Sequence, residues 1–293
     1  MENTYNNLKQ GERGAWISIL AYIFLSGLKL FIGYIALSEA LWADGLNNAT
    51  DIIASVAVLI GLRISRKPPD ADHRYGHFRA ETVASLVASF IMMAVGLQVL
   101  FQAVSKFRVQ SYESPDMIAG WTAIGCAVVM YFVYLYNIRL ARRIGSAALT
   151  AAAQDNRSDA LVSAGTFVGI VGSQFGLPWL DPLTALAVGL IICKTAWDIF
   201  RDSSHALTDG FDAAELQAIR QTVRGISGVK KIIDVKARVH GNNTFVDMTI
   251  AVEPELNVSE SHAITEKIER RMLEAHGIAH AHIHIEPFES AAK

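Results

Sequence analysis

Six runs of apolar residues, each about as long as a lipid bilayer is thick, dominate the sequence. A helix needs roughly 20 apolar residues to cross the hydrocarbon core, so runs of this length are typical of a helical membrane protein. A polar N-terminal arm, residues 1–14, precedes the first run and lacks the pattern of a cleaved secretory signal. The expected membrane spans are residues 15–37, 41–62, 81–103, 117–138, 150–172 and 180–200.

Charged residues are concentrated at the C-terminal end of the chain. The 293 residues include 26 basic and 28 acidic side chains, of which 10 and 12 lie in residues 211–293. Only 18% of all residues are charged, against about 25% in an average soluble domain. A net charge of −2 provides no basic surface for nucleic acid. We therefore expect a membrane domain over 15–209 and a soluble C-terminal domain over 210–293.

The distribution of lysine and arginine among the loops predicts the orientation. Basic residues occur in the N-terminal arm, in the loop between spans 2 and 3, and in the loop between spans 4 and 5. The 1–2 and 5–6 loops have none, and the 3–4 loop has Lys106 and Arg108. Short cytoplasmic loops carry the excess of positive charge. The sequence thus predicts a multi-pass protein of the cell membrane with both termini in the cytoplasm.

The C-terminal domain is predicted to be a small α+β domain. Its periodicity changes between helical and alternating patterns in the order helix, strand, strand, helix, strand. We expect an antiparallel sheet packed on two helices, and a second helix that begins without a complete capping box. About 80 residues are few for an independently stable core, so pairing with a second copy is expected. The expected elements are residues 212–225, 230–239, 244–252, 259–274 and 281–286.

Polar side chains interrupt the second and fifth spans. Asp44, Asn47 and Asp51 share one face of the second helix, and Asp155 and Asp159 share one face of the fifth. An ionisable residue inside a bilayer is costly and indicates function. The two helices can present paired oxygen ligands to one divalent cation. For Asp44, a place at the membrane surface near the end of its span is an equally good explanation.

The loop between spans 2 and 3 contains a second group of candidate ligands. His73 and His77 lie four residues apart, and Asp70 precedes them by three, which is the spacing of metal ligands. Arg74 stands where a metalloprotease has its glutamate base, so protease chemistry is not expected. A solvated loop with two histidines is the alternative.

Histidines also accumulate in the C-terminal domain. The segment 280–286 alternates histidine with apolar residues and ends in glutamate, so its four polar side chains share one strand face. That face is either a metal site or a solvated surface. The six histidines of the domain are His240, His262, His276, His280, His282 and His284.

Taken together, these residues resemble the cation diffusion facilitators, a family of secondary transporters of divalent metals. The matching motifs are ADGLNNATD at 43–51, HRYGHFRAE at 73–81 and the pair Asp155 and Asp159. The resemblance covers nearly the whole chain. It implies a homodimer that exports metal from the cytoplasm in exchange for protons, with a metallochaperone-like, ferredoxin-like C-terminal domain. It also implies a transporter without a catalytic cofactor, not an enzyme.

The resemblance assigns roles to particular positions. It implies a transport site of Asn47, Asp51, Asp155 and Asp159, a loop site of Asp70, His73 and His77, a C-terminal site of Asp247, His262, His284 and Glu286, and a dimer interlock between Arg79 and Asp209. Zinc transporters of the family usually have a histidine in the transport site, and this chain has oxygen ligands only. Such ligands suit manganese, so the chain resembles the manganese branch.

Metal and proton are expected to compete for the transport site. Burial away from water favours the protonated form of a carboxyl group, and a metal ion must displace that proton to bind.

Three alternatives to manganese transport remain open. The substrate could be Zn²⁺, Fe²⁺, Co²⁺ or Cd²⁺ instead of Mn²⁺. The protein could also be a membrane-anchored metal sensor that transports nothing. The third alternative is a membrane hydrolase built on His73 and His77, and the absence of a nucleophile or a glutamate base beside that pair argues against it.

Overall fold

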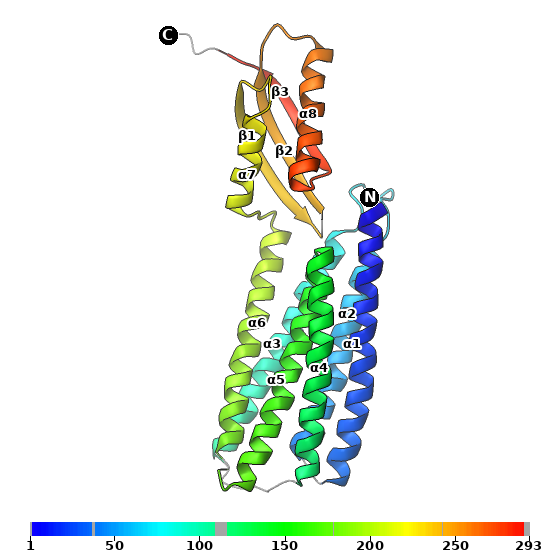
Figure 1. The fold of residues 1–293 in the computed structure, drawn as a ribbon, viewed down its shortest axis with the longest axis vertical. Helices are drawn as coiled ribbons and strands as arrows, with labels where there is room; N and C mark the ends of the chain where they lie inside the picture. The colour runs from blue at the N-terminus through cyan, green and yellow to red at the C-terminus, as the bar shows by residue number, and fades with distance from the viewer. Residues whose placement is uncertain (1, 37–38, 109–115, 178, 242, 290–293) are drawn as a thin grey trace. The chain divides into compact units, whose positions relative to one another are not determined.

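The computed structural model describes residues 2–36, 39–108, 116–177, 179–241 and 243–289 (Figure 1). The chain divides into two compact units, Met1–Ser203 and Ser204–Lys293. The first unit is helical, and the second combines three strands with two short helices. The helix α6 begins in the first unit and ends in the second.

Six long helices, one for each expected span, make up the first unit. Each has 27 to 34 residues, which at about 1.5 Å per residue is long enough to cross a bilayer. By length and composition, α1 to α4 qualify as membrane spans within the described residues. The expected N-terminal arm is helical from Glu2 and continues into the first span. The helices are α1 (Glu2–Ile35), α2 (Glu39–Ser65), α3 (Arg79–Arg108), α4 (Met117–Ile144), α5 (Ala147–Gln174) and α6 (Leu180–Leu207).

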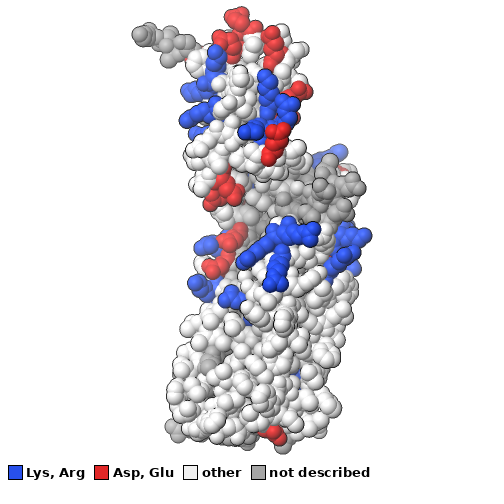
Figure 2. All heavy atoms as spheres, viewed as in Figure 1, with Lys and Arg blue, Asp and Glu red and all other residues white. Residues whose placement is uncertain are grey.

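The helices pack closely where small residues face one another. α1, α2, α4 and α5 form a bundle, and α3 packs on α2 and α5. A Cβ atom at Gly61 of α2 would lie 2.2 Å from the Cβ of Ala84 in α3, and one at Gly96 of α3 would lie 2.7 Å from the Sγ of Cys193 in α6. Such close contacts between backbones are typical of membrane helices. Figure 2 shows Lys and Arg gathered at one end of this unit and a surface almost free of charge over the rest.

The second unit contains α7 (Ala213–Arg224), β1 (Lys231–His240), β2 (Asn243–Val252), α8 (Val258–His276) and β3 (His280–Pro287). The predicted order of elements is confirmed, but the prediction of a wholly antiparallel sheet is wrong. The strand order is β1-β2-β3, and β3 pairs with β2 in parallel, with Val246 opposite Ala281 and Val252 opposite Pro287. The reason is α8, which returns the chain to the end where β2 began, so that β3 repeats its direction.

Both helices of this unit begin at well-formed caps. Asp212 accepts hydrogen bonds from the amides of Ala214 and Glu215 at the start of α7. At the start of α8, Asn257 and Glu260 form a complete capping box, so the prediction of an incomplete one is wrong. The helix begins at Val258, one residue earlier than expected, which makes Asn257 its cap. One core then forms between the helices and the sheet, with Ile219, Val223, Met248, Ile250, Ile268 and Met272 all buried.

Candidate metal transport site

Three carboxylates from two helices converge inside the helical bundle. One oxygen each of Asp51 in α2, Asp155 in α5 and Asp159 in α5 lies within 4.8 Å of the others. The side chains of Asp51 and Asp159 are buried, and Asp155 is half-buried. Negative charges this close repel one another, so the cluster needs protons or a cation among its oxygens. This arrangement can bind a divalent metal ion.

Asn47 completes the group of four positions expected at this site. It lies one helical turn before Asp51, and its Nδ2 donates to Asp51 Oδ2 over 3.3 Å. Rotation of the side-chain amide would direct its carbonyl oxygen toward a cation instead. The structure therefore brings together all four residues that the sequence assigned to the transport site.

Tyr22 of α1 belongs to the same cluster and was not among the residues predicted for it. Its buried hydroxyl donates to Asp159 Oδ2 and lies 3.1 Å from Asp155 Oδ2. A phenol has a single hydrogen, so it can donate to only one carboxylate at a time. The signal was present in the sequence, because buried polar residues recur along one face of α1 at three- and four-residue intervals. These residues are Ser18, Tyr22, Ser26 and Lys29.

A buried ion pair lies farther along the same helices. Lys29 Nζ is 2.8 Å from Asp44 Oδ2, and both side chains are almost completely buried. Lys29 also donates to Ser163 Oγ over 2.9 Å and to Asn48 Oδ1. Ser163 in turn donates to Asp44 Oδ2 over 3.1 Å. Asp44 is thus paired with Lys29 inside the bundle, at the start of the candidate span Asp44–Ser65, and is not one of the three clustered carboxylates.

This ion pair is displaced from the transport site along the bundle axis. Lys29 follows Tyr22 by seven residues, and Asp44 precedes Asp51 by seven, which corresponds to about 10 Å of helix in each case. Both displacements run toward the connection between α1 and α2. The pair joins α1 to α2, and through Ser163 to α5, the three helices that contribute side chains to the carboxylate cluster.

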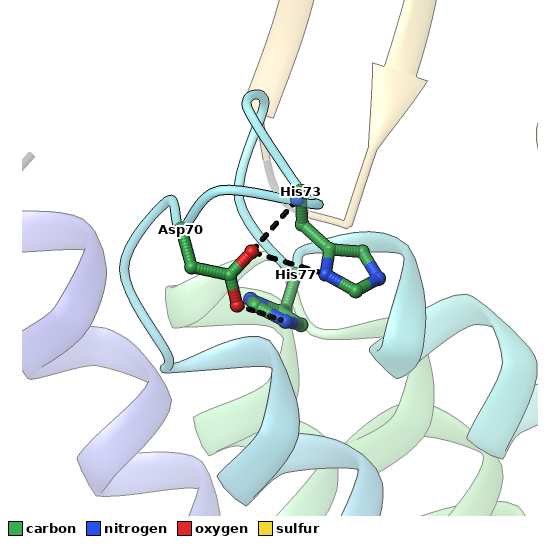
Figure 3. Close-up of side chains that lie close together, drawn as sticks. All are labelled: Asp70, His73 and His77. Atoms are coloured by element: carbon green, nitrogen blue, oxygen red, sulfur yellow. Dashed lines mark hydrogen bonds and ion pairs between the residues drawn. The ribbon is translucent and has the colours of Figure 1, made fainter.

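The expected loop residues also converge (Figure 3). The carboxylate of Asp70 faces both imidazole rings: Oδ1 is 3.2 Å from His73 Nδ1, and Oδ2 is 3.4 Å from His77 Nε2. The ring centroids are 4.3 Å apart. The backbone amide of His73, with its ring and the Asp72 amide, holds the pKa of the Asp70 carboxyl below its usual range. One carboxylate and two imidazoles form a ligand set suited to a divalent cation.

A hydrogen bond joins the far end of the loop to the end of α2. Ser65 at the end of α2 donates to the carbonyl of Phe78 over 3.1 Å, next to His77. Gly76 has φ +81° and lies against the Phe78 ring, a turn that only glycine adopts without strain. The side chains of Asp70 and His73 are exposed, whereas that of His77 is only 12% exposed.

The four expected ligands of the C-terminal domain do not converge within one chain. Asp247 pairs with Arg238 over 2.9 Å, and His284 is 3.8 Å from Glu286. These side chains lie on the sheet face opposite the helices, whereas His262 is an exposed residue of α8 beside Glu266. Within the described residues, the clusters of three potential ligands are the two in the helical unit.

The predicted interlock between Arg79 and Asp209 remains a prediction. Arg79 begins α3 in the first unit, and Asp209 follows α6 in the second. Asp209 has φ +60°, a left-handed conformation that is uncommon outside glycine.

Comparison with known proteins identifies the family. Residues 15–208 match the family described as "Cation efflux transmembrane domain", and residues 211–288 match "Cation efflux protein, cytoplasmic domain". The chain therefore belongs to the cation efflux family, the cation diffusion facilitators, and is a multi-pass metal efflux transporter. The predicted family is confirmed, and it is a family of transporters rather than enzymes.

Three relatives are similar over nearly their whole length. The chain is 61% identical to the "Manganese efflux system protein MneS" of Bacillus subtilis, over 97% of this chain and 98% of the relative. It is 56% identical to the "Uncharacterized transporter YdbO" of the same organism, over 98% and 99%. It is 29% identical to the "Manganese efflux system protein MneP", over 94% and 95%. The names of MneS and MneP support the resemblance to the manganese branch.

Breaking the buried ion pair from one side should destabilise the helical unit. Lys29→Met leaves the Asp44 carboxylate buried without its cation, at a cost of about 3–5 kcal/mol. The double variant Lys29→Met with Asp44→Leu removes both charges and should recover most of that loss. Thermal unfolding of the full chain in mild detergent measures both, with the exposed Lys67→Met as the control. Equal stability of the single and double variants would contradict the pairing.

Proposed function

We propose that this protein exports Mn²⁺ from the cytoplasm in exchange for protons. The observation that supports this most directly is the buried cluster of Asp51, Asp155 and Asp159 with Asn47 beside it. The cluster offers oxygen ligands alone, which suit manganese, whereas imidazole suits zinc. The names of two relatives as manganese efflux proteins support the same substrate. Mn²⁺ is the transported substrate here, and the proposal includes no catalytic cofactor.

Proton exchange follows from the chemistry of the same carboxylates. Three acidic side chains within 4.8 Å need either protons or a divalent cation. Metal binding therefore releases protons, and proton binding releases metal. If the site opens to each side of the membrane in turn, an inward proton gradient drives metal outward. Tyr22 supplies a hydrogen bond to one of these carboxylates.

The direction of export rests on the proposed orientation. Lys and Arg are concentrated at the end of the helical unit where α1 begins and α4 ends. By the distribution of positive charge, that end faces the cytoplasm. Both termini are then cytoplasmic, and the loop site of Asp70, His73 and His77 lies on the side from which metal enters. We propose that this loop site binds the same divalent ions before transport.

Removing a charge from the cluster should abolish transport. Asp51→Asn and Asp159→Asn keep the shape of the side chains but each removes one charged ligand, so Mn²⁺ flux should fall at least tenfold. The assay is Mn²⁺ uptake and proton release in vesicles containing the purified protein, with the exposed Asp202→Asn as a matched control. Full transport by both variants would contradict the site. Absence of flux in the unmodified protein would favour a metal sensor.

The identity of the ligand at position 47 should affect metal preference. Asn47→His introduces an imidazole, which should shift the ratio of transported Mn²⁺ to Zn²⁺ toward zinc. Both metals are supplied together to the same vesicles and counted separately, and Fe²⁺, Co²⁺ and Cd²⁺ are tested in the same way. An unchanged ratio would mean that selectivity is determined by other residues.

We further propose that the protein acts as a homodimer joined by Arg79 and Asp209. A small C-terminal domain and its family match support pairing of two copies. Asp209→Arg alone should weaken the dimer in mild detergent because it places two positive charges together. Adding Arg79→Asp should restore the opposite pairing and the dimer, as measured by the mass of the particle in solution. A single variant that dimerises like the unmodified chain would contradict the interlock.

The C-terminal histidines are proposed to regulate transport. Because Asp247, His262, His284 and Glu286 do not converge in one chain, a metal site formed by them requires a second copy. The double variant His262→Ala with His284→Ala should then raise the Mn²⁺ concentration needed for half-maximal transport, severalfold, without changing metal preference. Unchanged concentration dependence would leave dimerisation as the role of this domain.

A further inference from the structure

A cavity of about 830 Å³ opens at the surface between α1 and α4. It lies at the end of the helical unit where α1 begins and α4 ends. Its lining includes Lys9 and Arg13 from α1 and Arg139 and Arg143 from α4, and it includes no acidic residue. Four cationic side chains from two helices thus surround one hollow in the described structure.

Along one face of α4, the residues that line the cavity change from basic to aromatic. Arg143, Arg139, Tyr136 and Phe132 are separated by four, three and four residues, so they share one face. Tyr136 is 46% exposed and Phe132 is 65% exposed. The apolar part of the cavity therefore continues into the uncharged outer surface of the helical unit.

The neighbouring face of α1 follows the same gradient. Lys9, Arg13, Trp16 and Leu20 are separated by four, three and four residues. Trp16 is 44% exposed and Leu20 is 61% exposed. Aromatic side chains between a basic and an aliphatic band are typical of the boundary between lipid headgroups and hydrocarbon. The basic end of the cavity is thus at headgroup level and its aromatic end at hydrocarbon level.

The four cationic groups have no acidic counterpart in the described part of the chain. No carboxylate of a described side chain forms an ion pair with Lys9, Arg13, Arg139 or Arg143. Nearby basic residues differ, since Arg66 is 2.8 Å from Glu12. The four positive charges around this cavity repel one another. An anion bound among them would balance their charge and so reduce that repulsion.

We propose that this cavity binds an anionic phospholipid, with its phosphate among the four cations and an acyl chain over Phe132. Guanidinium groups bind phosphate oxygens through paired hydrogen bonds. Basic pockets between membrane helices are suited to anionic headgroups. A free phosphate ion would use the basic end alone and leave the apolar end unoccupied. The continuous change from basic to aromatic lining therefore favours an amphiphile.

The bound lipid would connect the start of α1 to the end of α4. α1 also carries Tyr22 of the carboxylate cluster, so the lipid would hold in place a helix that contributes to the transport site. The lipid site is independent of which metal is transported and of proton coupling.

The experiment measures lipid binding to the full chain purified in mild detergent. Phosphatidylglycerol is titrated, and the bound molecules are counted by native mass spectrometry. Arg143→Gln is compared with Arg142→Gln, which changes the same charge at the adjacent exposed position outside the cavity lining. Arg143→Gln should weaken binding about fivefold, the effect of one basic residue near an anionic headgroup. Arg142→Gln should weaken it less than twofold.

Further measurements with other lipids and with phosphate identify the ligand. Phosphatidylcholine should bind at least tenfold more weakly than phosphatidylglycerol, and inorganic phosphate at the same concentration should not displace the bound lipid. Arg143→Lys should retain most of the binding because it keeps the charge, and unfolding temperatures without lipid serve as the folding control. The proposal is overturned if phosphatidylglycerol does not bind, if both arginine variants lose binding equally, or if phosphatidylcholine binds as well. Displacement by inorganic phosphate would assign the cavity to a soluble anion and also overturn it.

Discussion

A charge or polar group between membrane helices is costly unless a partner lies beside it, and this constraint organises the helical unit. The polar face of α1 satisfies it. Tyr22 donates to an α5 carboxylate, Ser26 to the carbonyl of Gly45 in α2, and Lys29 to groups of α2 and α5. Ser18 accepts hydrogen bonds from Asn137 in α4 and from α5. One helix therefore connects the polar groups of three others.

The same constraint distinguishes two groups of acids in the bundle. Asp44 has a permanent partner in Lys29, so its charge is balanced within the protein. Asp51, Asp155 and Asp159 have no such cation in the described cluster, and a tyrosine hydroxyl contributes a hydrogen bond but no positive charge. The missing charge has to come from outside the protein as protons or metal. The position of Lys29 thus distinguishes Asp44, whose charge is balanced by a lysine, from the three clustered carboxylates, whose charge is not balanced by one.

The closeness of the four residues proposed for metal transport could be predicted from sequence because they occur as pairs within single helices. The four-residue interval from Asn47 to Asp51 and from Asp155 to Asp159 places each pair on one face before any packing is known. Tyr22 was not predicted. The polar intervals along α1 indicate a buried face, but the contact of that face with the carboxylates depends on how α1 packs against α5. The convergence of the three loop side chains could be predicted because they lie within eight residues of one another, and a turn at Gly76 brings them together.

Prediction was less successful where pairing depends on a neighbour distant in sequence. Alternation identified all three strands of the second unit but does not encode their direction, and the parallel pairing of β3 follows from the path through α8. The capping box was missed because Asn257 lies before the expected start of the helix. The proposed C-terminal ligands were inferred from a family pattern, and in this chain they lie on opposite sides of the sheet and helix layers.

The contact between α2 and α3 has a mechanical consequence. Gly61 lies directly against Ala84, Val58, Leu62 and Ala88 share one buried cluster, and Ser65 is hydrogen-bonded to the far side of the loop. The two helices and their loop therefore form a closely packed hairpin. The loop histidines lie where the two helices are connected, and Asp51 lies within α2. Because these contacts run from the loop along both helices, we expect a tilt at the loop end to move the Asp51 carboxylate as well.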